Sequence, residues 1–321
     1  MQHRAIYTDY PWADPDVERD ILAAVGCELV SSPGKTEDVL CEHVADVDAI
    51  MTCWAPITAR VIDAAKRCRH VARTGIGLDN IDVPHATSRG VLVTNVPDYC
   101  TEEVAEHALA MMFALGRKIA ACHLATKQGR YDLVAALPID LLGGKTVGVV
   151  GLGQTGAALA AKCGALGMRV MGTNRSGQAP RGVEWAPLDR LLEASDYVSL
   201  NLPLTGATRH LIGREQLRRM KPTAFLVNTA RGGLIDHDAL AEALDGGRLA
   251  GAALDVQETE PPDLAAAPMN DPRVIVTPHT AFCSPRAILE LRQRVARQTA
   301  DFLQGRTPEN VINPQVLPAR A

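Results

Sequence analysis

The sequence predicts an α/β protein made of two doubly wound domains, each built on a parallel sheet. At 321 residues the chain exceeds what one ordinary hydrophobic core supports, and a length of about 150 residues per domain suggests two. Short apolar runs alternate with helical patterns along most of the chain, which favours parallel sheets covered by helices. The third observation is a strand, turn, helix and strand unit at residues 145–175 that carries three closely spaced glycines.

The first domain is expected to combine the two ends of the chain. Its patterns predict strands at residues 5–9, 27–31, 49–53, 70–74 and 91–95, with helices at 14–24, 36–44 and 58–65. A final helix is expected at residues 284–304, and we expect the proline-bearing tail after it, residues 305–321, to pack back on this domain. We therefore assign residues 1–96 and 284–321 to it.

A long helical pattern begins at Thr101 and continues to residue 130. Two acidic residues follow Thr101, which suits a helix N-terminus. Val104, Ala108 and Met111 belong to a wide apolar stripe, which predicts a helix buried on several sides. We interpret this helix as the connector between the domains and as part of a homodimer contact. The stripe alone fits simple core packing equally well.

The glycine unit predicts a dinucleotide-binding site. A strand at 146–150 precedes Gly151, Gly153 and Gly156, which have the spacing G-x-G-x-x-G. The first glycine permits a tight turn, the second lets the backbone approach a pyrophosphate, and the third lets the helix pack closely on the strand. The helix N-terminus then offers free amides to the phosphates. Glycine triplets occur by chance, but the flanking strand and helix are the context that a dinucleotide site requires.

The remaining elements complete a Rossmann pattern for the second domain, residues 97–283. After the strand at 168–173 we expect strands at 197–202, 224–228, 250–255 and 274–277, separated by helices at 187–194, 214–220 and 237–245. In open sheets of this kind, ligands bind outside the carboxyl ends of the strands. The residues that follow these strands are therefore the candidates for function.

The end of the strand at 168–173 indicates which nicotinamide nucleotide to expect. An acidic residue about 20 positions after the turn would hold the ribose hydroxyls of NAD(H) and repel a 2′-phosphate. This chain has Asn174 instead, followed by Arg175 and Ser176, which can supply a charge-assisted bond and a hydroxyl donor. We expect NADP(H) to be favoured, with NAD(H) possible. The alternative is an Arg175 that only faces solvent.

Three polar residues follow predicted strands: Arg231 in VNTARGGLID, Glu260 in LDVQETEPP and His279 in VTPHTAF. A guanidinium can clamp an α-keto carboxylate and polarise its carbonyl. A histidine can exchange a proton with a hydroxyl near neutral pH, and a carboxylate beside it orients the ring and favours the imidazolium. With a nicotinamide, these groups suit hydride exchange with a 2-hydroxy acid. Singly, each also fits a purely structural role.

A glycine-rich loop, RTGIGLDNIDV, follows the predicted strand at 70–74. Backbone amides near Ile76 and Gly77 can hold a small carboxylate at the carboxyl end of that strand. A plain connecting loop is the alternative.

Composition and charge argue against several other functions. A net charge of −4 gives no basic excess for binding nucleic acid or an anionic membrane. The chain has no long apolar run and no apolar signal-peptide core in its first ten residues, so we expect a cytoplasmic protein. The eight cysteines form no C-x-x-C pair and have no clustered partners at ligand spacing, so no metal is expected.

Seven blocks resemble, in the same order, those of the D-isomer-specific 2-hydroxyacid dehydrogenase family: GIGLDNID, NVPDYCTEEVAEHALA, GLGQTG, NLPLT, FLVNTARGGLID, LDVQETEP and TPHTAF. The resemblance implies a Rossmann domain inserted in a flavodoxin-like substrate domain, with the active site between them. It implies that Arg231, Glu260 and His279 are catalytic. It also implies that substrate is bound by the amides of Ile76 and Gly77 together with Arg231 and His279. The blocks add further cofactor-binding candidates: Gln154, Thr155, Leu202, Pro203, Thr208, Thr229, Ala230 and, near the nicotinamide, Asp255.

The resemblance leaves two functions open. We favour an NAD(P)-dependent oxidoreductase of the D-isomer type, acting on a small glyoxylate-like or hydroxypyruvate-like acid. Glu260 disfavours formate and Ile76 disfavours phosphite, because relatives acting on those substrates carry glutamine and lysine there. The text from Tyr99 resembles phosphoglycerate-dehydrogenase-like members and the C-terminal-binding-protein corepressors. The alternative is therefore a nucleotide-sensing interaction scaffold with little turnover.

Overall fold

The structure is a computed structural model that describes residues 3–317. Contacts between residues divide the chain into two compact units. One unit is Met1–Tyr99 together with Ser284–Ala321, and the other is Cys100–Cys283. The predicted change of domain after residue 96 lies slightly before the change that the contacts give.

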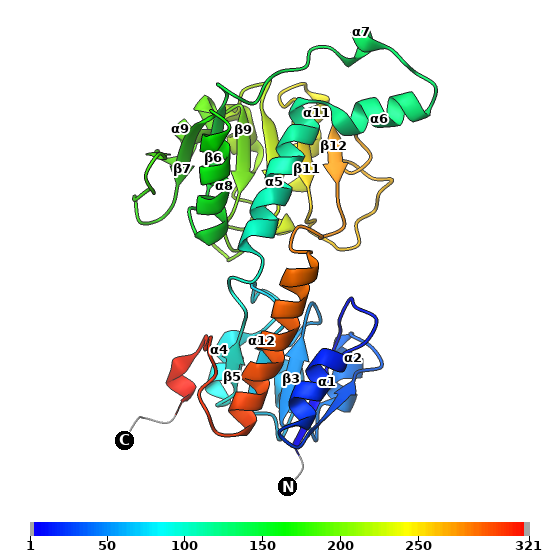
Figure 1. Ribbon diagram of the computed structural model, residues 1–321, viewed down its shortest axis with the longest axis vertical. Helices are drawn as coiled ribbons and strands as arrows, with labels where there is room; N and C mark the ends of the chain where they lie inside the picture. Colours follow the sequence, from blue (N-terminus) through cyan, green and yellow to red (C-terminus); the bar gives the residue numbers. More distant parts are fainter. Residues whose placement is uncertain (1–2, 318–321) are drawn as a thin grey trace. The chain divides into compact units, whose positions relative to one another are not determined.

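The first unit contains a five-stranded parallel sheet in the order β2-β1-β3-β4-β5, which is the flavodoxin-like order. The strands are β1 (His3–Tyr7), β2 (Cys27–Ser31), β3 (Ala49–Thr52), β4 (His70–Arg73) and β5 (Leu92–Thr94). The helices are α1 (Asp16–Ala23), α2 (Glu37–His43), α3 (Ala59–Ala64), α4 (Val83–Ser88) and α12 (Pro285–Leu303) (Figure 1). The predicted strands are confirmed to within two residues, because each apolar run that forms one is buried in the sheet.

Helix α4 and the C-terminal tail differ in how well the sequence predicted them. Helix α4 was not predicted, because its six residues, VPHATS, have no apolar period. Its N-cap is Asp82, whose side chain accepts a hydrogen bond from the His85 amide at 2.9 Å. The tail was expected to pack back on this unit, and it does so along β5. There the Asn313 side-chain oxygen accepts from the Val93 amide at 2.8 Å. A short 3-10 helix, Pro314–Val316, follows.

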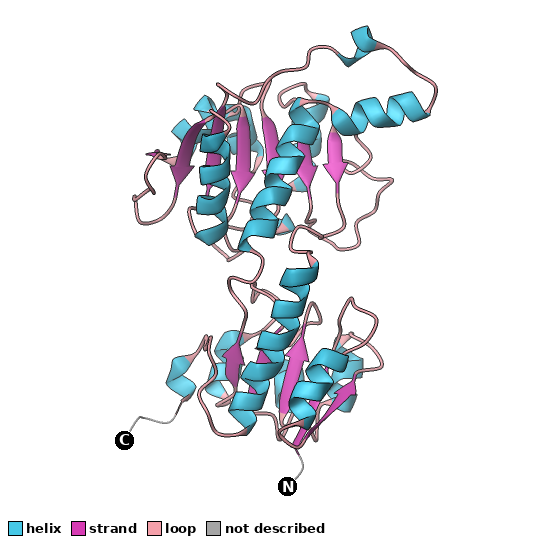
Figure 2. Cartoon of the chain, in the orientation of Figure 1, coloured by secondary structure: helices cyan, strands magenta, loops and turns pink. Residues whose placement is uncertain are grey.

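The second unit contains a seven-stranded parallel sheet in the order β12-β11-β10-β9-β6-β7-β8, and its strands all point the same way (Figure 2). The strands are β6 (Thr146–Val150), β7 (Arg169–Thr173), β8 (Glu184–Trp185), β9 (Tyr197–Leu200), β10 (Phe225–Asn228), β11 (Gly251–Leu254) and β12 (Val274–Val276). The helices are α5 (Thr101–Gly116), α6 (Ile119–Lys127), α7 (Leu133–Ala136), α8 (Gln154–Ala165), α9 (Leu188–Ala194), α10 (Arg214–Arg219), the 3-10 helix η1 (Gly232–Leu234) and α11 (His237–Asp245). The strand order reverses at β6, as in a Rossmann domain.

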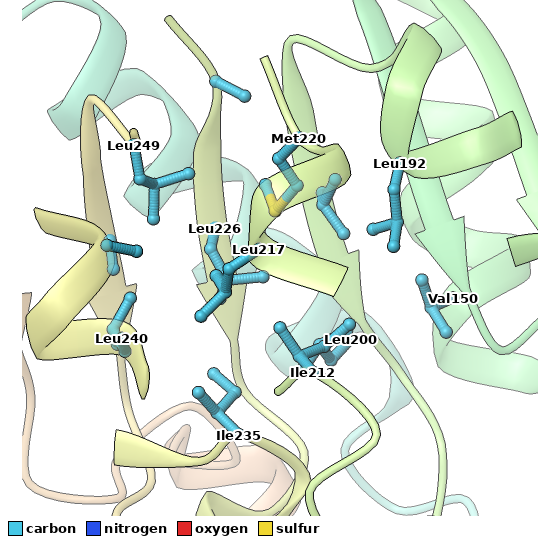
Figure 3. Close-up of a cluster of buried hydrophobic side chains, with 14 of the residues drawn as sticks. Val150, Leu192, Leu200, Ile212, Leu217, Met220, Leu226, Ile235, Leu240 and Leu249 are labelled. Carbon is cyan, nitrogen blue, oxygen red and sulfur yellow. The ribbon is translucent and has the colours of Figure 1, made fainter. Parts of the chain in front are cut away.

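Alternate residues of the central strands face two separate cores. Val147 and Val149 of β6 pack with α5 and α8 on one face, and these helices cover the sheet in Figure 1. Val150 packs on the other face with residues of α9, α10 and α11. Figure 3 shows this second cluster, which includes Leu226 of β10 and Leu217 of α10. With both faces covered, the edge formed by the strands' carboxyl ends remains for ligands.

The prediction of a single helix from Thr101 to residue 130 is wrong. The helix ends at Gly116, and α6 continues at an angle of 60° after Lys118, which adopts the left-handed conformation at φ 52°. Gly116 allows α5 to pack closely on β9, because a Cβ there would lie 2.2 Å from the Tyr197 hydroxyl oxygen. Helix α5 buries its apolar stripe as expected, whereas α6 buries none of its residues.

Candidate active site

The turn after β6 has the geometry that close backbone approach requires. Gly151 lies at φ 96°, and a Cβ there would lie 2.2 Å from the Asn201 carbonyl oxygen. A Cβ on Gly156 would lie 1.9 Å from the Gly151 carbonyl oxygen, so only glycine lets α8 begin so close to β6. A Cβ on Gly153 would have no described heavy atom within 4 Å. The backbone at the start of α8 therefore borders open space, which fits a pyrophosphate held by helix N-terminal amides.

The loop after β7 contains the residues expected to choose the nucleotide. The Asn174 amide donates a hydrogen bond to the Gln178 carbonyl oxygen at 2.7 Å, whereas its own oxygen is buried without a hydrogen-bond partner among the described residues. Arg175 and Ser176 are exposed. Arg181 adds a second exposed cation, and residues 174–183 contain no acidic residue. The unpaired Asn174 oxygen can accept a hydrogen bond from a donor such as a ribose hydroxyl, and Arg175, Ser176 and Arg181 place cations and a hydroxyl on the surface of the same loop.

The three residues expected to carry the chemistry follow neighbouring strands. Arg231 follows β10, Glu260 follows β11 and His279 follows β12, and these strands are adjacent in the sheet. His279 Nδ1 lies 2.8 Å from Glu260 Oε2. One guanidinium nitrogen of Arg231 donates to the Ala230 carbonyl oxygen at 2.8 Å. The structure thus joins two of the three residues by a hydrogen bond and brings the third to the same edge of the sheet.

The charge state of Glu260 determines which imidazole nitrogen of His279 is available for proton exchange. Burial raises the pKa of the Glu260 carboxyl group, but the hydrogen bond and charge of His279, the Gln257 amide and Arg231 together lower it below the ordinary value. An ionised carboxylate only accepts hydrogen bonds. His279 Nδ1 must therefore carry the hydrogen, which leaves Nε2 to exchange a proton.

Asp255 shapes the loop that holds His279. Its carboxylate is fully buried and accepts hydrogen bonds from the Thr277 hydroxyl at 2.6 Å, the Thr280 amide at 2.9 Å and the Ala281 amide at 2.8 Å. His279 itself lies at φ 55°, and its amide donates to the Asp255 carbonyl oxygen at 2.8 Å. A left-handed non-glycine residue persists only when its surroundings fix its conformation. Here the hydrogen bonds of Asp255 fix the loop on both sides of His279.

Sequence reasoning missed one member of this network. His107 of α5 lies with Nε2 3.2 Å from the Thr277 hydroxyl oxygen and 3.6 Å from the Asp255 carboxylate. The block EVAEHALA contains His107, but its helical position gave no sign that α5 would pack beside the loop after β12. Only the tertiary contact reveals it.

The remaining cofactor candidates lie at the start of α8 or on loops that follow strands of the sheet. Gln154 and Thr155 open α8. The Thr208 hydroxyl donates to the Pro203 carbonyl oxygen at 2.8 Å, which closes the loop that begins at Leu202. The Thr229 hydroxyl is buried without a hydrogen-bond partner among the described residues, and the Ala230 amide donates to the Asn228 side chain at 3.0 Å.

Comparison with known proteins identifies the family. The family model described as "D-isomer specific 2-hydroxyacid dehydrogenase, NAD binding domain" matches residues 109–281. The chain is 41% identical over 299 residues to the glyoxylate reductase of Korarchaeum cryptofilum, which covers 89% of this chain and 88% of that protein. The chain belongs to the D-isomer specific 2-hydroxyacid dehydrogenase family.

Solved structures support the same assignment for this dehydrogenase. The NADPH-dependent glyoxylate/hydroxypyruvate reductase from Sinorhizobium meliloti, in complex with NADP and malonate, has a TM-score of 0.89 at 27% identity, with 100% of each chain covered. The D-lactate dehydrogenase from Aquifex aeolicus, complexed with NAD and lactic acid, has a TM-score of 0.88 at 26% identity and covers 98% of this chain and 100% of that one.

Several predictions at the level of the family are confirmed. The fold is α/β with a Rossmann domain, and the protein is an NAD(P)-dependent oxidoreductase that acts on CH–OH groups. Its reaction is the hydride transfer of a 2-hydroxyacid dehydrogenase, and its substrate is a small molecule. The alternative of an interaction scaffold with little turnover loses its support.

The candidate substrate loop of the dehydrogenase lies in the first unit, after β4. The Arg73 side chain donates to the Gly77 carbonyl oxygen at 2.9 Å, and the Asn95 amide donates to the Ile76 carbonyl oxygen at 2.8 Å. These bonds fix the backbone of the loop through its carbonyl groups. A role for the Ile76 and Gly77 amides in binding substrate stays a prediction.

Residues 3–317 contain no group of three or more His, Cys, Asp or Glu side chains that could hold a metal ion. In the same residues no single helix has the length and apolar character to cross a membrane, although the bent pair α5 and α6 passes that test when the two are taken together.

Proposed function

We propose that the dehydrogenase reduces a short 2-keto acid of the glyoxylate or hydroxypyruvate type to the D-2-hydroxy acid, with NADPH as the favoured nucleotide. The observation that carries this proposal is the hydrogen bond between His279 and Glu260 at the ends of β11 and β12, beside the Arg231 loop. The name of the Korarchaeum cryptofilum relative, glyoxylate reductase, supports the substrate class.

The chemistry divides among the three residues. Arg231 binds the carboxylate of the keto acid and polarises its carbonyl group through paired hydrogen bonds. His279 holds a proton on Nε2 and gives it to the carbonyl oxygen, which becomes the hydroxyl of the product. Glu260 keeps the ring oriented through Nδ1, 2.8 Å away. When bound, the nicotinamide supplies the hydride that C2 of the keto acid receives.

The preference for NADPH rests on the loop after β7. Asn174 stands where a carboxylate would repel a 2′-phosphate, and exposed Arg175 and Ser176 offer a cation and a hydroxyl to that phosphate. The Sinorhizobium meliloti enzyme is described as NADPH-dependent, which supports this choice, whereas the Aquifex aeolicus enzyme was solved with NAD. The proposed preference for NADPH therefore rests on the charge of the loop after β7.

A direct test measures the oxidation of NADPH and NADH with glyoxylate, hydroxypyruvate, pyruvate and phenylpyruvate. We expect the highest kcat/KM with glyoxylate or hydroxypyruvate and NADPH. In Asn174→Asp, kcat/KM with NADPH should fall by about tenfold or more relative to NADH, because the new carboxylate repels the phosphate. Arg218→Ala removes an exposed cation of α10 and should change neither value. An Asn174→Asp enzyme with an unchanged ratio would contradict the nucleotide assignment.

We also propose that the protein is a homodimer and that residues 119–141 form part of the contact. This segment, from α6 to beyond α7, stands away from the rest of the second unit (Figure 1). More than half of the exposed large apolar side chains in the described part of the chain lie in it, among them Tyr131 (94% exposed), Leu133 (76%) and Leu141 (72%). A group of exposed apolar side chains of this size is typical of a protein interface.

A further inference from the structure

A second polar cluster lies beside the three catalytic candidates and has no part in the proposed chemistry. Glu258 follows β11, two residues before Glu260, and its Oε1 lies 2.6 Å from His210 Nε2. The same oxygen accepts a hydrogen bond from the Arg209 guanidinium at 3.3 Å. Arg209 and His210 belong to the loop after β9. The pair formed by His210 and Glu258 therefore bridges two loops whose strands are not adjacent, because β10 lies between them.

The loop after β10, which carries Arg231, passes between those two loops. On one side, a Cβ on Gly232 would lie 1.9 Å from the Gln257 carbonyl carbon and 2.4 Å from the Glu258 amide nitrogen. On the other side, the His210 amide donates to the Gly233 carbonyl oxygen at 2.8 Å. Gly232 and Gly233 are thus enclosed by backbone that the His210–Glu258 pair holds together. Position 232 requires glycine because a Cβ there would collide with backbone atoms, which cannot move aside as a flexible side chain could.

The backbone conformation of His210 indicates that contacts with neighbouring loops fix the loop after β9. His210 lies at φ 51°, in the left-handed region, as His279 does. Non-glycine residues in this region persist where the surrounding structure fixes them, and they gather at functional sites. Both left-handed histidines of this unit bond to glutamates of one loop, residues 258–260, through His210–Glu258 and His279–Glu260.

We infer that His210 and Glu258 are positioning residues, which clamp the loops after β9 and β11 around the Arg231 loop and so set where Arg231 stands relative to His279 and Glu260. The inference rests on the proposed function, because it concerns the placement of the proposed substrate clamp. Glu258 also stands next to Gln257, whose amide donates to Glu260 Oε1 at 3.0 Å. A movement of Glu258 is therefore expected to shift Glu260, the residue that orients His279.

A purely structural surface pair would behave differently. The side chains of His210 and Glu258 are 38% and 26% exposed, and exposed ion pairs typically contribute little to stability. Such a pair would affect the melting temperature at most. A clamp on Arg231 would instead raise KM for the keto acid more than it lowers kcat, since the substrate carboxylate would meet a less ordered guanidinium.

The experiment compares steady-state kinetics with glyoxylate and NADPH for wild type and four variants. Glu258→Ala and His210→Gly both remove the bond, and glycine also accepts the left-handed backbone without strain. Each should raise KM for glyoxylate by about fivefold to tenfold, as expected for the loss of one charge-assisted hydrogen bond. Glu258→Gln keeps a neutral acceptor for His210 and should raise KM less than Glu258→Ala does. Glu242→Ala removes the exposed pair with Arg214, 2.5 Å apart in the same unit, and serves as the matched control.

A double-mutant cycle tests whether the clamp acts through Arg231. In an Arg231→Lys background, Glu258→Ala should add less than about twofold, because the group being positioned is already altered. Additive effects would overturn the inference. A rise in KM for NADPH with an unchanged KM for glyoxylate would also overturn it, because the pair would then serve the nucleotide loop.

A readout independent of activity separates this inference from the proposed function. Glu258→Ala should speed hydrogen exchange at the amides of His210 and Ile212, which donate to Gly233 and Leu234, by about tenfold, and Glu242→Ala should not. If wild type failed to turn over any keto acid, the proposed function would be wrong. The hydrogen-exchange measurement would still test whether the His210–Glu258 pair holds the loops together. Unchanged exchange in Glu258→Ala would overturn the clamp even in an active enzyme.

Discussion

At the scale of the residue, Glu260 decides which nitrogen of His279 can exchange a proton. Its pKa is lowered in the fold despite burial, so it stays ionised at and above the ordinary carboxyl range and accepts the Nδ1 hydrogen. The acceptor and its charge are separate contributions. The acceptor orients the ring, and the charge makes the carboxylate an acceptor only, so that Nδ1 is the nitrogen that carries the hydrogen.

A change of Glu260 to Gln separates these two contributions. Glutamine keeps an oxygen that can accept from Nδ1, but it has no negative charge, does not titrate and carries an NH2 group that can donate to Nδ1 instead. We expect kcat/KM for glyoxylate reduction to be lower than in wild type at neutral pH, and to lack the fall that wild type shows as the pH drops through the lowered pKa of Glu260; the pH profile of kcat/KM measures both. Glu242→Gln, at a residue that pairs with Arg214, should leave the profile in place. A Glu260→Gln profile that coincides with wild type would show that the carboxylate charge has no such effect.

Sequence reasoning reached some of these residues and not others, for a physical reason. Arg231, Glu260 and His279 stood out because each follows an apolar strand and carries a reactive group. The partners that hold them did not stand out. His107 lies on a different helix from the loop that it contacts, and His210 meets Glu258 across an intervening strand. These contacts depend on tertiary packing, which no local pattern contains.

At the scale of the element, burial explains which predictions succeeded. The strands were predictable because both faces of each sheet are covered, so each strand appears as a short continuous apolar run. Strand β8 was missed because it has only two residues, Glu184 and Trp185, and both are exposed. The helix from Thr101 was predicted as too long because α6 keeps helical composition after α5 has ended. The bend lies at Lys118, a non-glycine residue with φ 52°, which no local pattern marks.

The segment of residues 119–141 gives a prediction at this scale. Leu133→Asp places a charge on a side chain that is 76% exposed and that we propose to lie in the dimer contact. Wild type should have twice the 34.3 kDa chain mass by light scattering, and Leu133→Asp should shift toward the single chain, because burying an unpaired charge is costly. The control is Leu264→Asp, at a leucine that is 65% exposed elsewhere in the unit. Equal masses for wild type and Leu133→Asp would exclude this segment from the contact.

At the scale of the whole molecule, the chain leaves its first unit, builds a complete second unit and returns. Composition and length suggested two domains, and the positions of the expected strands suggested that the C-terminal helix and tail rejoin the first. The tail's hydrogen bonds with Val93 complete that unit. The exact residues at which the chain passes from one unit to the other could not be predicted from the sequence, because they depend on which residues contact each unit in the folded chain.

The first unit also contains a group that links its stability to pH. His70 in β4 is fully buried beside Phe302 of α12, and burial lowers its pKa to about 3. Below pH of about 6.5 the unfolded chain binds a proton on this histidine that the folded chain does not. The free energy of unfolding should therefore fall as the pH drops from there toward 3, by up to about 2 kcal/mol between pH 6.5 and pH 5. Urea unfolding at these two pH values measures the difference.

A His70→Gln variant should show a smaller loss of stability over the same interval, whatever its stability at neutral pH. His43→Gln, at an exposed position in α2, should keep the wild-type dependence. A His70→Gln protein with the full wild-type loss would mean that other groups cause it.

We propose that His279, oriented by Glu260, supplies the proton when this dehydrogenase reduces a keto acid. The most direct measurement is kcat for glyoxylate reduction with NADPH in wild type and His279→Ala, with NADPH binding followed by fluorescence titration. We predict that kcat falls by about 100-fold or more, as the loss of general acid catalysis implies, while NADPH binding stays near wild type. Turnover in His279→Ala close to that of wild type would show that His279 does not supply the proton.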